Sequence, residues 1–210
     1  MTFSIIGIDR EEGVIGSAVA SRWTGVGGST QFFRPHVGMV NMQNFSNVRI
    51  AHAIQDNMQR KMKLESCIFD ALETDALKDQ RQCLIATIDG FFSCYTGSKC
   101  ADSCRDKYGK DCIVGGNNLA SGDVVDIMIQ TFEDSEGMPL AERLLLCLEA
   151  GQDAGGDKRG QEAAGLKVFR LSYPLQPFLP LDLRVDHHRN PLYELRRLFE
   201  IFEDNKRYMF

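Results

Sequence analysis

The order of strand-like and helix-like segments constrains the fold of this chain more than any single motif. A pair of strand patterns opens the chain, helical patterns then come in pairs between groups of strands, and a helical pattern follows the last strands. A doubly wound parallel sheet would instead need single helices that cross between neighbouring strands. Paired helices favour two antiparallel sheets packed face to face, with helices outside each sheet. We therefore predict an α+β fold arranged as a four-layer αββα sandwich.

These segments are identified from the spacing of apolar residues. Runs of apolar and β-branched residues bounded by turn residues predict strands, and apolar residues at helical spacing predict helices. The hairpin signal Asp89-Gly90 supports one strand pair. The predicted strands cover 3–8, 14–20, 37–42, 83–88, 91–95, 163–169 and 181–185. The predicted helices cover 50–72, 75–80, 124–132, 139–148 and 191–202, and the polar stretch 96–121 is predicted to be a long functional loop.

Length and charge narrow the class of protein. The chain has 210 residues, 43% of them hydrophobic, which fits a single domain spanning 1–210. The net charge is −5 and basic residues form no long block, so nucleic acid and anionic membranes are not expected partners. The first residues lack the pattern of a secretory signal, and no apolar run is long enough to span a bilayer. We expect a cytoplasmic protein.

Seven cysteines are present, five of them between Cys83 and Cys112. An odd number of cysteines without a secretory signal favours a reducing compartment and free thiols. The five show no Cys-x-x-Cys spacing and their segment has no histidine, so we predict neither a metal nor another cofactor. A thiol- or metal-dependent role for this segment stays open as an alternative.

The glycine-rich stretch 154–160 holds an acid and two bases, Asp157, Lys158 and Arg159. Glycine tolerates positive φ and lets a backbone approach a ligand closely. The three charged residues fit a polar ligand site, but they fit equally a solvated turn in which they pair with one another.

Short motifs in a fixed order run through nearly the whole chain. They are 2–6, 16–21, 26–27, 38–43, 81–82, 96–97, Cys100, 116–117 with Leu119, 154–157 with 159–160, 182–186, Pro191 and 194–196. In this order they resemble the family known as domain of unknown function 1028. The resemblance implies an αββα sandwich like that of the N-terminal-nucleophile (Ntn) hydrolases, and it implies no particular substrate.

The resemblance also suggests a chemistry for the start of the chain. In an Ntn enzyme the first residue of the mature chain supplies the nucleophile, and its own α-amine serves as the base. Thr2 becomes that residue if Met1 is removed, which a small second residue usually permits. We expect Arg22 to lower the pKa of the amine, and Asn117 to help a backbone N–H hold the oxyanion. Thr2 also fits an ordinary strand position, where a β-branched residue is favoured.

Five further residues are predicted to bind substrate: Ser21, Gln43, Arg81, Asp157 and Arg159. Structural roles compete with binding at Arg81, which precedes a strand, and at Asp157 and Arg159, which could clamp the glycine-rich turn.

The leading hypothesis is an enzyme that hydrolyses an amide-type bond in a small molecule. The alternative is a non-catalytic protein on the same fold that binds a small ligand or serves in assembly. The helical layers offer apolar faces that would suit a homodimer, although nothing in the sequence sets the stoichiometry.

Overall fold

The computed structural model describes residues 2–101, 103–171 and 181–207. Its strands are β1 (Thr2–Asp9), β2 (Val14–Ser21), β3 (Gln31–Arg34), β4 (Gly38–Asn44), β5 (Arg81–Thr87), β6 (Phe92–Thr96), β7 (Arg105–Gly109), β8 (Cys112–Gly116), β9 (Ala163–Arg170) and β10 (Leu181–Val185). Its α-helices are α1 (Val26–Thr30), α2 (Val48–Gln59), α3 (Leu64–Leu72), α4 (Asp123–Asp134), α5 (Leu140–Asp153) and α6 (Pro191–Arg207).

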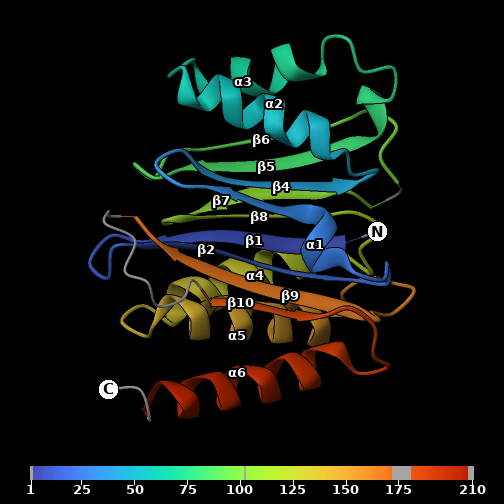
Figure 1. Ribbon diagram of the computed structural model, residues 1–210. Helices are drawn as coiled ribbons and strands as arrows, with labels where there is room; N and C mark the ends of the chain where they lie inside the picture. Colours follow the sequence, from blue (N-terminus) through green and yellow to red (C-terminus); the bar gives the residue numbers. More distant parts are fainter. Residues whose placement is uncertain (1, 102, 172–180, 208–210) are drawn as a thin grey trace.

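Two antiparallel sheets lie face to face between helical layers (Figure 1). One sheet has six strands in the order β10-β9-β2-β1-β8-β7, and the other has four in the order β3-β4-β5-β6. Helices α2 and α3 pack outside the four-stranded sheet, whereas α4, α5 and α6 pack outside the six-stranded sheet. The predicted α+β fold, a four-layer αββα sandwich, is therefore confirmed.

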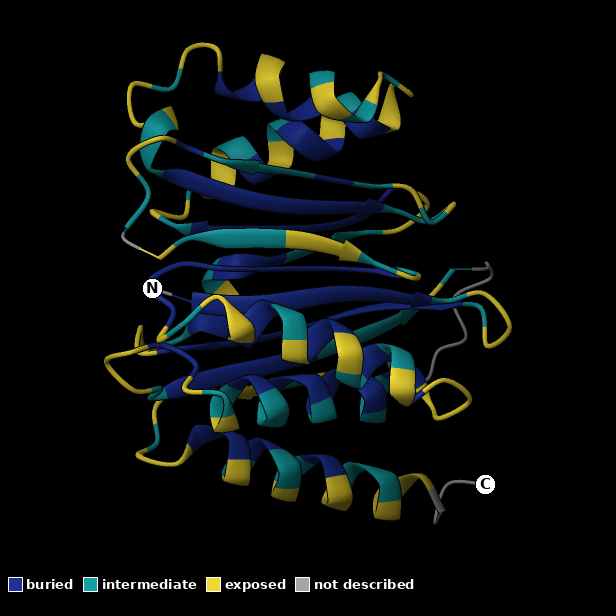
Figure 2. Ribbon diagram, turned by 180° about the vertical axis from the view of Figure 1, so that it is seen from behind, coloured by how far each residue is buried: buried dark blue, intermediate teal, exposed yellow. Residues whose placement is uncertain are grey.

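Both faces of the central strands are buried, which Figure 2 shows as dark blue ribbons between helices with exposed outer surfaces. In β1, Phe3 and Ile5 join the core beneath α4 and α5, whereas Ile6 and Ile8 join the core between the sheets. Alternate residues of a strand point to opposite faces, so each strand serves two cores. This explains why the strands appear in the sequence as nearly continuous apolar runs.

Local turn chemistry sets the hairpins. Between β1 and β2, the Asp9 carboxylate accepts hydrogen bonds from the N–H groups of Glu11 and Glu12, and Gly13 takes a φ of 67°. Between β5 and β6, the predicted turn is present, with Gly90 at a φ of 80°. Asp and Gly favour such turns because one can bond the backbone ahead of it and the other tolerates positive φ.

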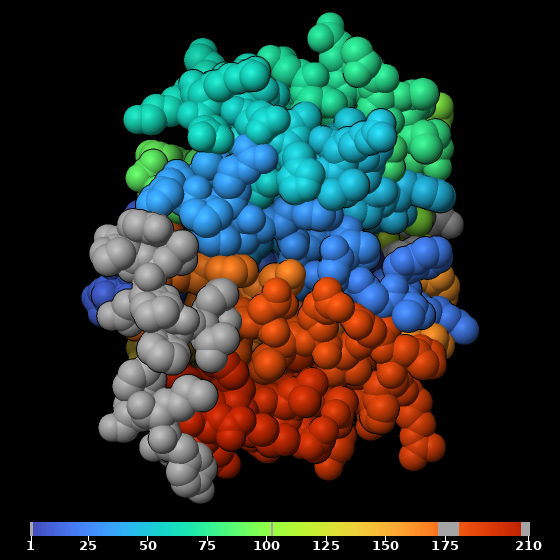
Figure 3. Space-filling model, in the orientation of Figure 1, coloured from blue at the N-terminus to red at the C-terminus, as the bar shows by residue number. Residues whose placement is uncertain are grey.

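The short helix α1 bridges the two sheets at one end. It packs against β2 and β9 of one sheet and against β3 and β4 of the other. The N–H of Gly25, just before α1, donates to Asp186 O at 2.8 Å. Figure 3 shows this blue region lying directly against the orange region around β10. This bridge forms one wall of the cavity described below.

Several predicted elements differ from the structure. The predicted helix over 50–72 is two helices, α2 and α3, because Lys61 between them takes a φ of 57°. The predicted helix over 75–80 is a 3₁₀ turn over Lys78–Gln80. The Asp75 carboxylate there binds Arg81 and accepts the Leu77 N–H, which favours a turn over a helix.

The predicted loop over 96–121 contains the hairpin β7–β8. Asp111 in its turn has a φ of 56°, and the edge strand β7 carries charged, partly exposed residues. Charged residues suit an edge strand, yet they remove the apolar alternation by which strands are recognised. The sequence analysis also missed α1 and β3.

Candidate functional site

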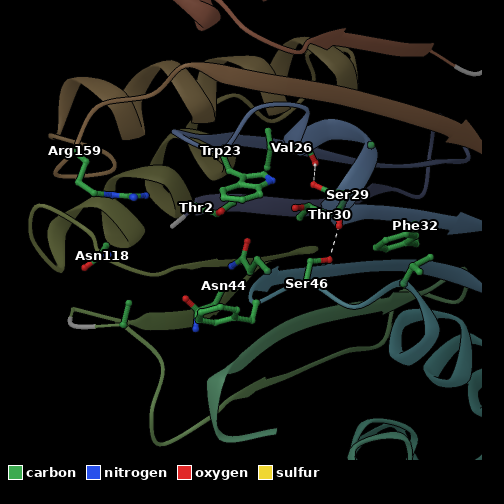
Figure 4. A pocket seen from close by; sticks show the side chains of 15 residues that line it. Thr2, Trp23, Val26, Ser29, Thr30, Phe32, Asn44, Ser46, Asn118 and Arg159 are labelled. Carbon is green, nitrogen blue, oxygen red and sulfur yellow. Dashed lines mark hydrogen bonds between the residues drawn. The ribbon is translucent and has the colours of Figure 1, made fainter. Parts of the chain in front are cut away.

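A cavity of about 600 Å³ opens at the end of the sandwich where β1 begins and β2 ends. Its volume is within the range of small-molecule sites. Strands of both sheets, α1, the first residue of α2 and five loops contribute to it (Figure 4). The described residues that line it are Thr2, Trp23, Val26, Gly28, Ser29, Thr30, Phe32, Gln43, Asn44, Phe45, Ser46, Val48, Ala101, Asn118 and Arg159.

Thr2 lies on the wall of this cavity, and only 4% of its surface is exposed. Its N–H donates to Asn117 Oδ1 at 3.1 Å, and its O accepts from the Asn117 N–H at 2.9 Å. Its hydroxyl donates to Ser21 Oγ at 3.2 Å, and that oxygen also accepts the Trp23 N–H at 3.0 Å. The nitrogen and the hydroxyl of Thr2 are thus both held in place at the cavity wall. Met1, on whose removal the nucleophile hypothesis depends, lies outside the described residues.

Behind Thr2, a chain of amide side chains runs between the two sheets. Asn117 Nδ2 donates to Gln82 Oε1 at 2.9 Å, and Gln43 Nε2 donates to the same oxygen at 3.0 Å. Gln82 Nε2 donates in turn to Thr96 Oγ1 at 3.0 Å and to Gly116 O at 3.1 Å. Gln82 therefore connects β5 and β8 across the sandwich.

The chain continues through side chains of β1, β2, β3 and β4. Ser4 Oγ donates to Gln43 Oε1 at 2.9 Å, and Asn41 Nδ2 donates to Ser4 Oγ at 3.1 Å. Ser17 Oγ donates to Asn41 Oδ1 at 2.9 Å, and Gln31 Nε2 donates to Ser17 Oγ at 3.0 Å. We call the seven side chains Ser4, Ser17, Gln31, Asn41, Gln43, Gln82 and Asn117 the inter-sheet polar chain. Each is at most 3% exposed, so these bonds have low-dielectric surroundings.

Asn117 was expected to help hold an oxyanion. The structure places it behind Thr2, fully buried, with its Oδ1, Nδ2 and backbone N–H engaged by Thr2 and Gln82. These bonds fit a positioning role for Thr2. The next residue, Asn118, lines the cavity and takes a φ of 51°. Asparagine tolerates this left-handed conformation better than most residues do.

Asp157 and Arg159 form a clamp at the cavity rim. Asp157 Oδ1 accepts the Arg159 backbone N–H at 3.0 Å and its Nε at 3.2 Å, while Asp157 Oδ2 accepts Nη2 at 3.0 Å. The Asp157 side chain has no exposed surface, whereas that of Arg159 is 35% exposed. Asp157 and Arg159 thus bind each other within the glycine-rich turn, and Arg159 still lies on the cavity surface.

Arg22 supports the same rim from outside. Its Nη1 donates to Arg159 O at 3.1 Å, and its Nε lies 3.6 Å from Glu162 Oε1. Both contacts join Arg22 to the rim loop. Within the described part of the chain, Arg22 has no contact with the Thr2 nitrogen through which it would lower the pKa of a free amine.

Arg81 lies in the wall behind the cavity. Its guanidinium binds Asp75 Oδ2 at 2.7 Å and also donates to Phe45 O. The exposed fractions of the two charged side chains are 5% and 9%. The bound arginine holds the pKa of the Asp75 carboxyl below its usual value. Arg81 thereby anchors Phe45, whose ring lines the cavity.

Of the predicted site residues, the structure brings Thr2, Gln43 and Arg159 onto one cavity surface. Ser21 contacts Thr2 directly, and Asp157 holds Arg159. The sequence analysis missed Trp23, Phe32, Asn44, Phe45 and Asn118. The adjacent amides at 117–118 after two glycines were a usable signal for Asn118, whereas the three rings carry no signal that separates them from core residues.

The cysteine-rich segment passes close to the cavity at Ala101. All seven cysteines are free thiols, and a hydrogen bond with the Cys104 thiol lowers the pKa of Cys100. Burial instead raises the pKa of Cys94 to about 12. Among the described residues, no group of three or more His, Cys, Asp or Glu could hold a metal ion. No helix in the described ranges is long and apolar enough to span a bilayer.

A family model and solved structures of other proteins match this chain. A crystal structure of protein SPO2555 from Silicibacter pomeroyi, assigned to the DUF1028 family model, aligns with a TM-score of 0.85 and 26% identity over 95% of this chain and 88% of that one. Anbu (ancestral beta-subunit) from Yersinia bercovieri aligns with a TM-score of 0.42 and 10% identity over 100% and 98% of the two chains, and no conclusion rests on it. No curated protein matches the sequence. The model of the family of unknown function DUF1028 matches residues 2–195, so the chain belongs to the DUF1028 family.

Proposed function

We propose that this protein hydrolyses an amide-type bond in a small molecule, with Thr2 as an N-terminal nucleophile. One observation carries the proposal: Thr2 lies on the wall of a 600 Å³ cavity, with its nitrogen held by Asn117 and its hydroxyl by Ser21. A nucleophile needs such placement, because a well-oriented group reacts far faster than a free one.

The proposed reaction has two steps. The Thr2 α-amine accepts the hydroxyl proton while Oγ attacks the amide carbon, and the C–N bond then breaks as the nitrogen takes up that proton. Water next hydrolyses the resulting ester and restores Thr2. An α-amine has a reference pKa of about 7.7–8.0, so a substantial fraction is neutral and able to act as a base near neutral pH. Removal of Met1 would provide this amine.

Two neighbours have proposed supporting roles. Asn117 accepts one hydrogen of the Thr2 nitrogen, which orients the lone pair of a free amine. Asn118 lines the cavity one residue further along, and we assign its side-chain amide to the oxyanion in place of Asn117. An amide donor aimed at a developing oxyanion stabilises the transition state more than the ground state.

The first test does not depend on knowing the substrate. A small aliphatic β-lactone acylates an activated hydroxyl by ring opening and stays attached, so we expect one adduct per chain, mapped by mass spectrometry to Thr2. Thr2→Ala should abolish the adduct, and substrate turnover should fall on the order of a thousandfold or more once a substrate is known. Thr24→Ala is the matched control, because Thr24 is an exposed neighbour in the next loop and should leave labelling unchanged.

The intact mass of protein from its native source decides between this function and the alternative. Loss of Met1 together with an adduct at Thr2 supports the hydrolase. Retention of Met1, or an adduct elsewhere, overturns the nucleophile and favours a non-catalytic protein that binds its ligand in the same cavity.

A further inference from the structure

The charge of the cavity wall is concentrated in one side chain. Among the described residues that line the cavity, only Arg159 has a charged side chain, and the other side chains are apolar, aromatic or neutral polar. A ligand with a free ammonium group would therefore meet a cation and no acid there. A ligand with an anionic group would meet a matching charge.

The bonds to Asp157 offset part of this charge, but they also fix the direction of the guanidinium and leave some of its donors free for a ligand. A guanidinium has five N–H donors, and the bonds to Asp157 use Nε and one donor of Nη2. The Asp157 carboxylate is fully buried behind the arginine. The guanidinium of Arg159 points into the cavity towards Thr2 and Trp23 (Figure 4). Its fork of donors matches the two oxygens of a carboxylate.

The side of the cavity away from Arg159 carries apolar side chains beside the hydroxyl groups of Ser29, Thr30 and Ser46 (Figure 4). Phe32 lies beyond Thr2 as seen from Arg159 (Figure 4), and Val26 and Val48 line the same cavity. Trp23 and Phe45, which also line the cavity, are 71% and 56% exposed. Large exposed rings in a cavity wall are typical of surfaces that a ligand covers. Thr2 lies between Arg159 and Phe32 (Figure 4), and Gln43 lines the same cavity.

From this arrangement we propose that the cavity binds amides that carry a free carboxylate on one side of the amide bond and an apolar group on the other, as N-acyl amino acids do. The carboxylate lies on the Arg159 fork, the apolar group lies against Phe32 and its neighbours, and the amide lies at Thr2. The proposal names the substrate class for the function proposed above and rests on the same cavity.

The test measures binding, so that it is independent of catalysis. N-hexanoylglycine and its neutral counterpart N-hexanoylglycinamide are titrated by calorimetry into the Thr2→Ala protein, and into the wild-type protein as a second measurement. The two probes differ by one charge at nearly equal size. A charge-assisted hydrogen bond contributes enough that we expect the acid to bind about tenfold or more tightly than the amide.

Variants assign that preference to Arg159. Arg159→Gln should bring the two affinities within about twofold of each other, and Arg159→Lys, which keeps the charge without the fork, should give an intermediate ratio. Arg49→Gln removes an exposed positive charge next to Val48 that does not line the cavity, so it should keep the full preference.

Equal affinities of the two probes, a preference that survives Arg159→Gln, or no binding of either probe would overturn the ligand class. None of these results bears on β-lactone labelling of Thr2. Failure of the labelling with a preserved acid preference would overturn the nucleophile and leave the ligand class standing.

Discussion

The space between the two sheets is polar at one end and apolar at the other. Near Thr2 it holds the inter-sheet polar chain, whereas at the far end of the same strands it holds a cluster of Ile6, Ile8, Ile15, Met39, Leu84, Ala86 and Ile113. Both ends are fully buried, so solvent access does not explain the difference. Buried polar side chains cost stability unless every partner is present, whereas apolar packing needs only shape. At the polar end, hydrogen bonds between side chains take the place of apolar packing between the sheets, and the cavity lies at this end.

The largest expected effect comes from the ion pair behind the cavity. Arg81→Met leaves the Asp75 carboxylate buried without its cation, and breaking such a pair costs roughly 3–5 kcal/mol of unfolding free energy. Chemical denaturation at pH 7 measures it. Arg197→Met is the control: its ion pair with Glu194 lies at the surface, where solvent screens the charges, so the unfolding free energy should change far less than in Arg81→Met.

The same pair predicts a pH dependence. The pKa of Asp75 is lowered in the folded protein, so the pair contributes stability above the unfolded pKa of about 3.9, and this contribution is lost as the pH falls through the folded value. The gap in stability between the wild type and Arg81→Met should therefore narrow between about pH 5 and pH 2. A gap that stays constant over this range would show that the ion pair is not its origin.

At the apolar end, Leu84→Ala should cost about 3 kcal/mol of unfolding free energy, because it opens a cavity where Leu84 packs against Gly115. Its effect should remain local, with the affinity for N-hexanoylglycine unchanged within about twofold. Leu77→Ala, at a residue 43% exposed, should cost less than about 0.5 kcal/mol. An equally large loss of ligand affinity in Leu84→Ala would show that the two ends are energetically coupled.

The smallest effect is expected within the inter-sheet polar chain. Ser4→Ala removes the donor to Gln43 and the acceptor of Asn41, for an expected cost of about 1–2 kcal/mol. Urea denaturation should resolve this cost from that of Ser29→Ala, whose hydroxyl donates to the carbonyl oxygens of Gly25 and Val26 in the preceding turn and should matter by less than about 0.5 kcal/mol. A neutral Ser4→Ala would mean that the polar chain adds no stability at this point.

Much of the architecture followed from the sequence. Strand β1 and its hairpin to β2 were predicted to within one or two residues, because apolar runs and the turn at Asp9 to Gly13 are local signals. Edge strand β7 was missed, since charged residues there replace the apolar alternation. Helix α1 was missed because five residues following a glycine carry too few apolar positions to show a period.

The site was predicted less completely, for a related reason. Thr2, Gln43 and Arg159 were named from motifs, yet the motifs do not say that these residues share one cavity. From the sequence, Trp23 and Phe45 cannot be told apart from core residues. An aromatic residue in a sequence does not indicate whether its ring packs in the core or lines a cavity.

By itself the sequence determined the sandwich, because alternating patterns and turn residues act over a few positions and favour one order of strands and helix pairs. Tertiary structure alone decided which polar groups meet. The Thr2 nitrogen finds Asn117, a residue 115 positions away, and Ser4 finds Gln43, which is 39 positions away. Such pairs depend on strand register and sheet stacking, and those are set by the packing of the whole interior rather than by any local run of residues.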